Sequence, residues 1–298
     1  RVRTPRIACR VCIAGNSGVM KIHHLQTASF CPFGGPLVHD RGFSGGHAHL
    51  LCHSLLVETN DGLVLIDTGF GTEDLQNPQE RLGLPFVTLM NVRFDPTLTA
   101  LQQIEALGYK SSDVRHVIPT HLDLDHAGGM PDFPKARVHI YEDEYLAAME
   151  PASLNEKQRY RPVHWRHAPD WQTYALEGES WFGFPAVRPL LGAGKDEILL
   201  IPVTGHTRGH TAIAVRSEGK WLLHCGDAYF HKGQLDLAHE HCPIGLEVFQ
   251  RLMAVDNAAR VENVARLRQL KFDHGHEIEL FSAHDKDEFE RLAHKAAV

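Results

Sequence analysis

The chain has 298 residues, with 30 Lys and Arg against 37 Asp and Glu and a formal net charge of −7. This length suffices to bury a core without disulfides, and 43% hydrophobic with 22% charged residues exclude a disulfide-rich mini-protein and a disordered chain. No uncharged apolar run approaches about 18 residues, which excludes a membrane-spanning helix. The acidic balance argues against nucleic-acid binding through a basic face. We therefore expect a globular protein with no nucleic-acid and no membrane partner.

The cysteines and the N-terminal residues indicate little chemistry. Six scattered cysteines do not form a disulfide framework, so we expect reduced thiols and a cytoplasmic protein. Cys9 and Cys12 form a CxxC pair, but no second pair follows at zinc-finger spacing. Residues 1–19 show no signal-peptide pattern, and strand pattern begins only after Met20. We interpret residues 1–19 as an N-terminal extension that need not be ordered, and residues 20–298 as a single domain.

The first half of the chain alternates strands and helices. Apolar runs over 49–59 and 63–69 flank the turn residues 60–62 and predict a hairpin, which a long polar loop follows. Asp95 and Pro96 are typical of a helix start, and Gly108 of its end. Strands over 114–120 and 136–141 and a helix over 142–150 come next. This alternation predicts an α/β sandwich.

The second half contains an irregular stretch and then further strands. Residues 151–194 concentrate the aromatic side chains, which either pack on the body of the protein or form a lid over a site. Regular pattern returns with strands over 197–203, 211–216, 221–227 and 277–283, a helix over 246–270 and a last helix from Asp285. The chain shows no repeat and no low-complexity linker, which favours one domain.

Potential metal ligands follow four of the predicted strands. The segment HxDxDH offers four side chains within six residues, and three other strand ends offer histidines or an aspartate. Imidazole and carboxylate groups are the usual ligands of the divalent metal ions in hydrolases. Strands in one sandwich bring their ends to a common edge, so these side chains are expected to converge. They are His121, Asp123, Asp125 and His126 in HxDxDH, His206 and His210 in GHTRGH, Asp227 in CGD and His284 in SAH.

These motifs, in this order, resemble the metallo-β-lactamase superfamily from about residue 22 to the end of the chain. The matching segments are LIDTG (65–69), THLDLDHAGG (120–129), TGHTRGH (204–210), HCGDA (224–228) and SAHD (282–285). The resemblance implies a four-layer αββα sandwich with a dinuclear metal site at one edge of its sheets. It implies the following roles: His121, Asp123 and His206 for the first metal, Asp125, His126 and His284 for the second, Asp227 as the bridge and Asp67 as a brace behind the ligands. His210 lies in the same motif as His206, and we expect it to support the ligands rather than to bind metal.

Asp123 departs from the family's usual HxHxDH pattern, in which a histidine stands at this position. A carboxylate can still ligate, and its harder oxygen shifts the preference toward iron or manganese. Aspartate is also shorter than histidine, so the alternative is a weak or open first site. We expect two divalent metal ions, with zinc favoured and iron or manganese left open by Asp123.

The expected reaction is hydrolysis by a metal-bridging hydroxide. Asp125 is the candidate to orient this nucleophile and carry its proton. The motifs look most like the lactonase-type branch, which opens N-acyl homoserine lactones and related esters. Those lactonases resemble one another in a tyrosine three residues after the bridging aspartate. Here that position is Phe230, so Tyr229, one residue earlier, is the candidate to reach the substrate oxygen.

Several other functions fit the same motifs. The site could serve a β-lactamase, a phosphotriesterase or a phosphodiesterase. With iron, it could serve an oxidoreductase similar to the persulfide dioxygenases. A protein that lost its first metal could bind a ligand without catalysis. In each case the expected partner is a small molecule, and a homodimer remains open.

Overall fold

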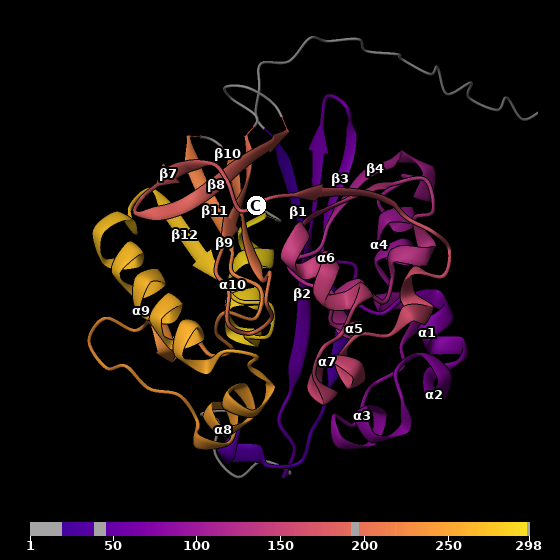
Figure 1. The fold of residues 1–298 in the computed structure, drawn as a ribbon, viewed down its shortest axis with the longest axis horizontal. Coiled ribbons are helices and arrows are strands. Elements are labelled where there is room, and N and C mark those ends of the chain that lie inside the picture. Colours follow the sequence, from indigo (N-terminus) through magenta and orange to yellow (C-terminus); the bar gives the residue numbers. More distant parts are fainter. Residues whose placement is uncertain (1–19, 39–45, 192–196, 218, 297–298) are drawn as a thin grey trace, which may run out of the picture.

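The computed structural model describes residues 20–38, 46–191, 197–217 and 219–296. In these ranges two six-stranded sheets lie face to face, and helices cover the outer face of each (Figure 1). The predicted N-terminal extension, residues 1–19 with Cys9 and Cys12, lies outside the described residues. No helix within the described ranges has the length and apolar composition needed to cross a membrane.

The first sheet has the strand order β1-β2-β3-β4-β5-β6. Its first three strands pair antiparallel, and β3 to β6 run parallel, which requires the crossover segments that carry α1 to α7. The predicted hairpin is β2–β3, whose turn closes on Gly62 at a φ of 113°. The strands are Lys21–Phe30 (β1), Leu50–Thr59 (β2), Gly62–Ile66 (β3), Val114–Ile118 (β4), Arg137–Tyr141 (β5) and Asp170–Tyr174 (β6).

The second sheet has the order β12-β11-β10-β9-β8-β7. Its neighbours pair antiparallel except β11 and β12, which run parallel and are joined by the segment that holds α8 and α9. The strands are Glu179–Trp181 (β7), Phe184–Leu191 (β8), Ile198–Pro202 (β9), Thr211–Ser217 (β10), Lys220–His224 (β11) and Ile278–Phe281 (β12).

Both faces of the central strands are buried, which explains why their sequences are apolar without alternation. In β3, Val64 and Ile66 face the second sheet and pack in one cluster with Ile213 of β10. Leu65 faces the other way and packs in the cluster that contains Ile104 of α4. On the second sheet, α9 supplies the equivalent outer layer. The predicted αββα sandwich is therefore confirmed.

The helices lie mostly in the connections between strands. The loop expected after the hairpin contains three short helices, α1 to α3, which the polar composition of this stretch did not indicate. The helices are Thr72–Gln76 (α1), Pro78–Arg81 (α2), Leu84–Leu89 (α3), Ala100–Ala106 (α4), Leu124–Ala127 (α5), Glu142–Met149 (α6), Leu154–Arg159 (α7), Ile244–Met253 (α8), Asn257–His274 (α9) and Lys286–Ala296 (α10).

The helix predicted over 246–270 is two helices. α8 ends at Met253, and Asp256 caps α9 by accepting hydrogen bonds from the backbone N–H groups of Ala258 and Ala259, both at 3.0 Å. The helix predicted from Asp95 is likewise shorter, because Thr99 caps α4 after a single 3-10 turn. In each case an N-capping residue inside the predicted range marks where the observed helix begins.

The irregular stretch over 151–194 forms regular structure in the part that the structure describes. It supplies α7, the edge strands β6 and β7, and β8, which lies next to β7. Its aromatic side chains pack against the sheets: Tyr160 is buried in the cluster outside the first sheet, and Trp181 packs on the cluster outside the second. The packing interpretation of these aromatic residues therefore describes them better than the lid.

Candidate metal centre

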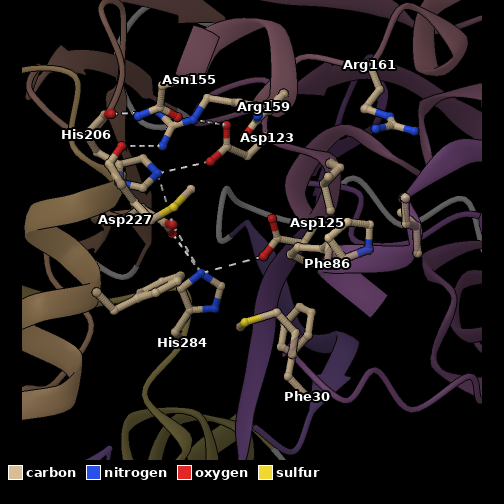
Figure 2. Close-up of a pocket in the computed structure, with 18 of the residues that line it drawn as sticks. Phe30, Phe86, Asp123, Asp125, Asn155, Arg159, Arg161, His206, Asp227 and His284 are labelled. Atoms are coloured by element: carbon tan, nitrogen blue, oxygen red, sulfur yellow. Dashed lines mark hydrogen bonds and ion pairs between the residues drawn. The ribbon is translucent and has the colours of Figure 1, made fainter. Parts of the chain in front are cut away.

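The predicted ligands converge at one edge of the sandwich because each follows the end of a strand. His121 follows β4 in the first sheet, while His206 follows β9, Asp227 follows β11 and His284 follows β12 in the second. The close-up shows the side chains of His206, Asp227 and His284 pointing toward those of Asp123 and Asp125 (Figure 2). They form two clusters with metal-ligand spacing.

The first ligand group consists of His121, Asp123, His206 and Asp227. Asp123 Oδ2 lies 3.1 Å from His206 Nε2 and 3.4 Å from His121 Nε2. Asp227 Oδ2 lies 3.4 Å from His206 Nε2 and 3.8 Å from His121 Nε2. Two imidazole nitrogens and two carboxylate oxygens thus face a common point.

The second ligand group consists of Cys52, Asp125, His126 and His284. Asp125 Oδ2 lies 3.7 Å from His126 Nε2 and 3.8 Å from His284 Nε2. The Cys52 thiol lies 3.5 Å from Asp125 Oδ2. Cys52 could not be predicted from the sequence, because nothing in the apolar strand β2 distinguishes this cysteine from a core residue.

Asp227 lies between the two groups. Its Oδ1 lies 3.2 Å from His126 Nε2 and 3.0 Å from His284 Nε2, whereas Oδ2 faces the first group. His284 Nε2 also lies 3.2 Å from Oδ2, so it contacts both oxygens. The carboxylate is therefore placed as a bridging ligand would be.

The buried polar atoms at this edge fit bound cations. His121 Nε2, His126 Nε2 and Asp227 Oδ1 are buried and have no hydrogen-bond partner. Leaving such atoms unpaired in a protein interior is unfavourable, and a divalent cation would satisfy all three. The residues present are therefore compatible with a pair of divalent metal ions.

Outer contacts orient the histidines. His126 Nδ1 donates to Asp67 Oδ2 at 2.9 Å, and His284 Nδ1 donates to the Leu51 carbonyl at 2.7 Å, which leaves both Nε2 atoms for the centre. Asp67 also accepts from the backbone N–H of Thr120 at 2.7 Å, directly before the ligand segment. These contacts place Asp67 behind the ligands, as the resemblance implies.

His210 supports Asp227 from behind. Its Nδ1 donates to the Val203 carbonyl at 3.1 Å, and its Nε2 accepts from the backbone N–H of Asp227 at 2.9 Å. Both ring nitrogens are thereby used away from the centre. Gly226 makes this close approach feasible, because a Cβ at that position would lie 2.6 Å from His210 Nε2.

Glu144 of α6 joins the two ligand-bearing loops, a role that the sequence analysis missed. This buried carboxylate accepts from the backbone N–H of Leu122 at 2.9 Å and from that of Gly209 at 3.0 Å. Tyr160 donates a third hydrogen bond at 3.0 Å. This role could not be predicted, because Glu144 lies in the first turn of a helix, where acidic residues are common.

Arg159, the last residue of α7, is the second contributor that was missed. Its Nε lies 3.1 Å from Asp123 Oδ1, and the ion pair is nearly inaccessible to solvent. Burial alone would raise the pKa of Asp123, but Arg159 and His121 outweigh it and hold that pKa well below its usual range. Asp123 is therefore an ionised carboxylate.

Tyr229 does not reach the centre, and the predicted catalytic role for it is wrong. Its side chain is fully buried in the cluster outside the second sheet, and its hydroxyl group lies 3.1 Å from Glu288 Oε1. The next residue, Phe230, points the other way and lines the cavity over the ligands. The backbone beyond β11 turns the two neighbouring side chains to opposite sides.

A cavity of about 550 Å³ opens onto the two groups (Figure 2). Asp123, Asp125 and His206 are among the residues at its base. Its walls are mostly apolar. Its polar wall comes from α7 and Arg161 rather than from the aromatic part of 151–194. The apolar wall includes Phe30, Leu82, Phe86, Met90, Phe230 and Phe249, and the polar wall includes Asn155, Lys157 and Arg161.

Comparison with known proteins agrees with this geometry. Residues 48–273 match the family model described as the metallo-beta-lactamase superfamily, so the chain belongs to that superfamily. His284 lies beyond the matched residues, yet the structure brings it to the same centre. The fold and the His and Asp clusters thus define a metallo-hydrolase-type member of this family.

Individual relatives are consistent with that class. The chain is 41% identical to a probable metallo-hydrolase of Mycobacterium tuberculosis over 268 residues, 90% of this chain and 81% of that protein. It is 26% identical to an N-acyl homoserine lactonase of Bacillus cereus over 231 residues, 75% and 80% of the two chains. A solved N-acyl homoserine lactone hydrolase, with its product at the catalytic metal centre, superposes with a TM-score of 0.67 at 18% identity, covering 92% and 96%.

Proposed function

We propose that this protein is a dinuclear metal-dependent hydrolase that opens a lactone or ester carrying an apolar acyl or aryl group. The observation that carries the proposal is the position of Asp227, whose carboxylate lies between two ligand groups at the base of an apolar cavity. A centre of this type is suited to the attack of activated water on a carbonyl carbon.

The chain's own residues would hold and serve the metal pair. When bound, two divalent ions activate water as a nucleophile and polarise the substrate carbonyl. The two ligand groups, joined by Asp227, would hold them, with zinc favoured by the histidine nitrogens. Asp125 belongs to the second group and also lines the cavity, so it is the residue placed to accept the proton of the attacking water and deliver it to the leaving oxygen.

The cavity wall supports an apolar substrate. Phe30, Phe86, Phe230 and Phe249 come from four separate segments and converge above the ligands. Apolar pockets with a few polar groups at one end orient a substrate by its polar end. The relatives named N-acyl homoserine lactonases support a lactone with an acyl chain as the first substrate to test.

The experiment combines metal analysis with a substrate panel. We expect about two equivalents of metal per chain and turnover of N-acyl homoserine lactones or aryl esters, with KM falling as the acyl chain lengthens. β-Lactams, phosphotriesters, phosphodiesters and persulfides complete the panel. Turnover confined to one of those classes would replace the proposed substrate, and fewer than two bound ions would contradict the dinuclear centre.

The matched variants are Asp227→Asn and Asp273→Asn. The first removes the charge of the bridging carboxylate and should abolish turnover and lower metal content. The second changes the same residue type on the exposed side of α9, remote from both ligand groups, and should alter neither. Equal activity in the two variants would show that Asp227 does not hold the metal pair.

A further inference from the structure

Arg159 touches two members of the first ligand group. Its Nε faces the Asp123 carboxylate at 3.1 Å, and one terminal nitrogen donates to the backbone carbonyl of His206 at 2.7 Å. The other terminal nitrogen donates to the Met253 carbonyl at the end of α8, at 2.6 Å. The two terminal nitrogens are thus held by backbone carbonyls, Nε forms an ion pair with Asp123, and Figure 2 shows the guanidinium group directly beside Asp123. A planar, rigid group fixed in this way can orient its carboxylate partner.

The two oxygens of Asp123 have different surroundings. Oδ1 faces Arg159, whereas Oδ2 faces His206 Nε2 at 3.1 Å and His121 Nε2 at 3.4 Å. The ion pair therefore turns one oxygen toward the charge of Arg159 and the other toward the two imidazole groups. A carboxylate free to rotate would offer both oxygens to the same cation.

A second contact fixes α7 on the same ligand-bearing loop. Glu156 accepts from Arg208 Nε at 2.7 Å, and Arg208 belongs to the GHTRGH segment that carries His206. Glu156 is itself held by the backbone N–H groups of Ala152 and Ser153, at 2.9 and 3.0 Å. The position of Arg159 against Asp123 therefore does not depend on their ion pair alone.

With Asp123 restricted to one oxygen, the first ligand group offers four donor atoms. They are two imidazole nitrogens and one oxygen each from Asp123 and Asp227. Four nitrogen and oxygen donors are typical of zinc, whereas manganese and ferrous iron take more oxygen ligands in six-coordinate sites. The positive charge of Arg159 also balances the carboxylate that stands where the related motif has a neutral histidine.

We propose that Arg159 is a positioning residue that restricts Asp123 to one ligating oxygen and thereby keeps the first site selective for zinc over manganese. This inference rests on the proposed dinuclear centre. Without Arg159, Asp123 turns both oxygens toward the first site, its donor number rises, and the preference shifts toward manganese. The second site, which Arg159 does not contact, keeps its preference.

The test is competitive metal loading of Arg159→Met, with zinc and manganese present together and both ions counted on the purified protein. We expect the zinc preference of one of the two sites to fall by about tenfold to a hundredfold. Cobalt-substituted protein gives a second readout, because four-coordinate cobalt(II) absorbs visible light more strongly than six-coordinate cobalt(II). We expect that absorption to decrease in Arg159→Met.

Two further variants make the outcome decisive. Arg166→Met changes an arginine of the same segment whose partner is the exposed Glu80, and it should match the wild type in both readouts. Arg159→Gln also removes the charge but keeps a donor for the backbone carbonyls, and it replaces Arg159→Met should that variant fail to fold. If the folded Arg159 variant keeps the zinc preference and the cobalt spectrum of the wild type, the inference about Arg159 is wrong, but the proposed function still stands. Wild-type protein with fewer than two bound ions would instead overturn the proposed function on which it rests.

Discussion

The hydroxyl group of Tyr229 lies 3.1 Å from each carboxylate oxygen of Glu288 in α10, and both side chains are buried. Burial, reinforced by the nearby charge of Asp285, raises the pKa of Glu288 to about 8. The carboxyl group is therefore protonated in the folded protein across the neutral range, whereas in the unfolded chain it ionises near its ordinary value.

Glu288 should make the protein less stable as the pH rises. Between its ordinary pKa of 4.5 and about 8, the folded state binds a proton that the unfolded state releases. Its contribution is complete below pH 4.5 and is lost as the pH rises to about 8, with a slope of up to about 1.4 kcal/mol per pH unit. Glu288→Gln cannot ionise and should lack this contribution to the slope.

Urea unfolding of the metal-free wild type and Glu288→Gln from pH 5 to pH 9 measures the difference. The variant should gain stability relative to the wild type through this range and level off above it. A difference that does not change with pH would show that Glu288 is already ionised in the fold.

The ligands could be predicted from sequence because each directly follows an apolar strand. Local order along the chain thus determines that His121 and His284 reach the same edge, although 163 positions in the numbering separate them. Arg159 and Glu144 could not be predicted, since their partners lie in two loops that follow strands of different sheets, β4 and β9. The prediction for Tyr229 was wrong for a related reason. The spacing within a motif does not determine to which side a turn directs each of two neighbouring side chains.

Asp123→His, which restores the family's usual motif, should destabilise this protein when made alone. It removes the carboxylate that faces Arg159 and leaves a buried guanidinium group without a counter-charge. Breaking a buried ion pair on one side costs about 3–5 kcal/mol. The double variant Asp123→His with Arg159→Met removes both charges and should recover much of that loss.

Denaturant unfolding of the four proteins in this cycle gives the coupling energy between the two side chains. We expect the double variant to lose less unfolding free energy than the two single variants lose together. Additive losses would mean that Arg159 and Asp123 contribute to stability independently of each other.

Glu144→Gln should loosen the metal centre without touching a ligand. Glu144 accepts from two backbone N–H groups, one in each ligand-bearing loop, and glutamine has only one carbonyl oxygen to replace them. The amide NH₂ would face a donor, which leaves a buried N–H unpaired and costs about 1–3 kcal/mol. Chelator competition should show weaker metal binding in Glu144→Gln. Glu142→Gln, on the same helix turn but without those contacts, is the control and should bind metal as the wild type does.

Tyr229 and Phe230 provide a test of which neighbour faces the substrate. Tyr229→Phe removes a hydroxyl group that contacts Glu288 in the core, so it should lower stability by about 1 kcal/mol and leave kcat/KM unchanged. Phe230 lines the cavity, with its ring centroid 4.6 Å from that of His284. Phe230→Ala should raise KM for long-chain substrates more than for short ones, because it removes apolar contact area from the wall.

Phe230→Tyr sharpens this comparison, since it adds a hydroxyl group to the side chain that faces the centre while keeping the ring. If the substrate is a lactone, a donor at this position should stabilise the developing negative charge on oxygen and raise kcat. Steady-state kinetics of the three variants, alongside their unfolding curves, separates the two residues. A large fall in kcat for Tyr229→Phe with stability retained would return the catalytic role to Tyr229 and contradict the orientation described for both side chains.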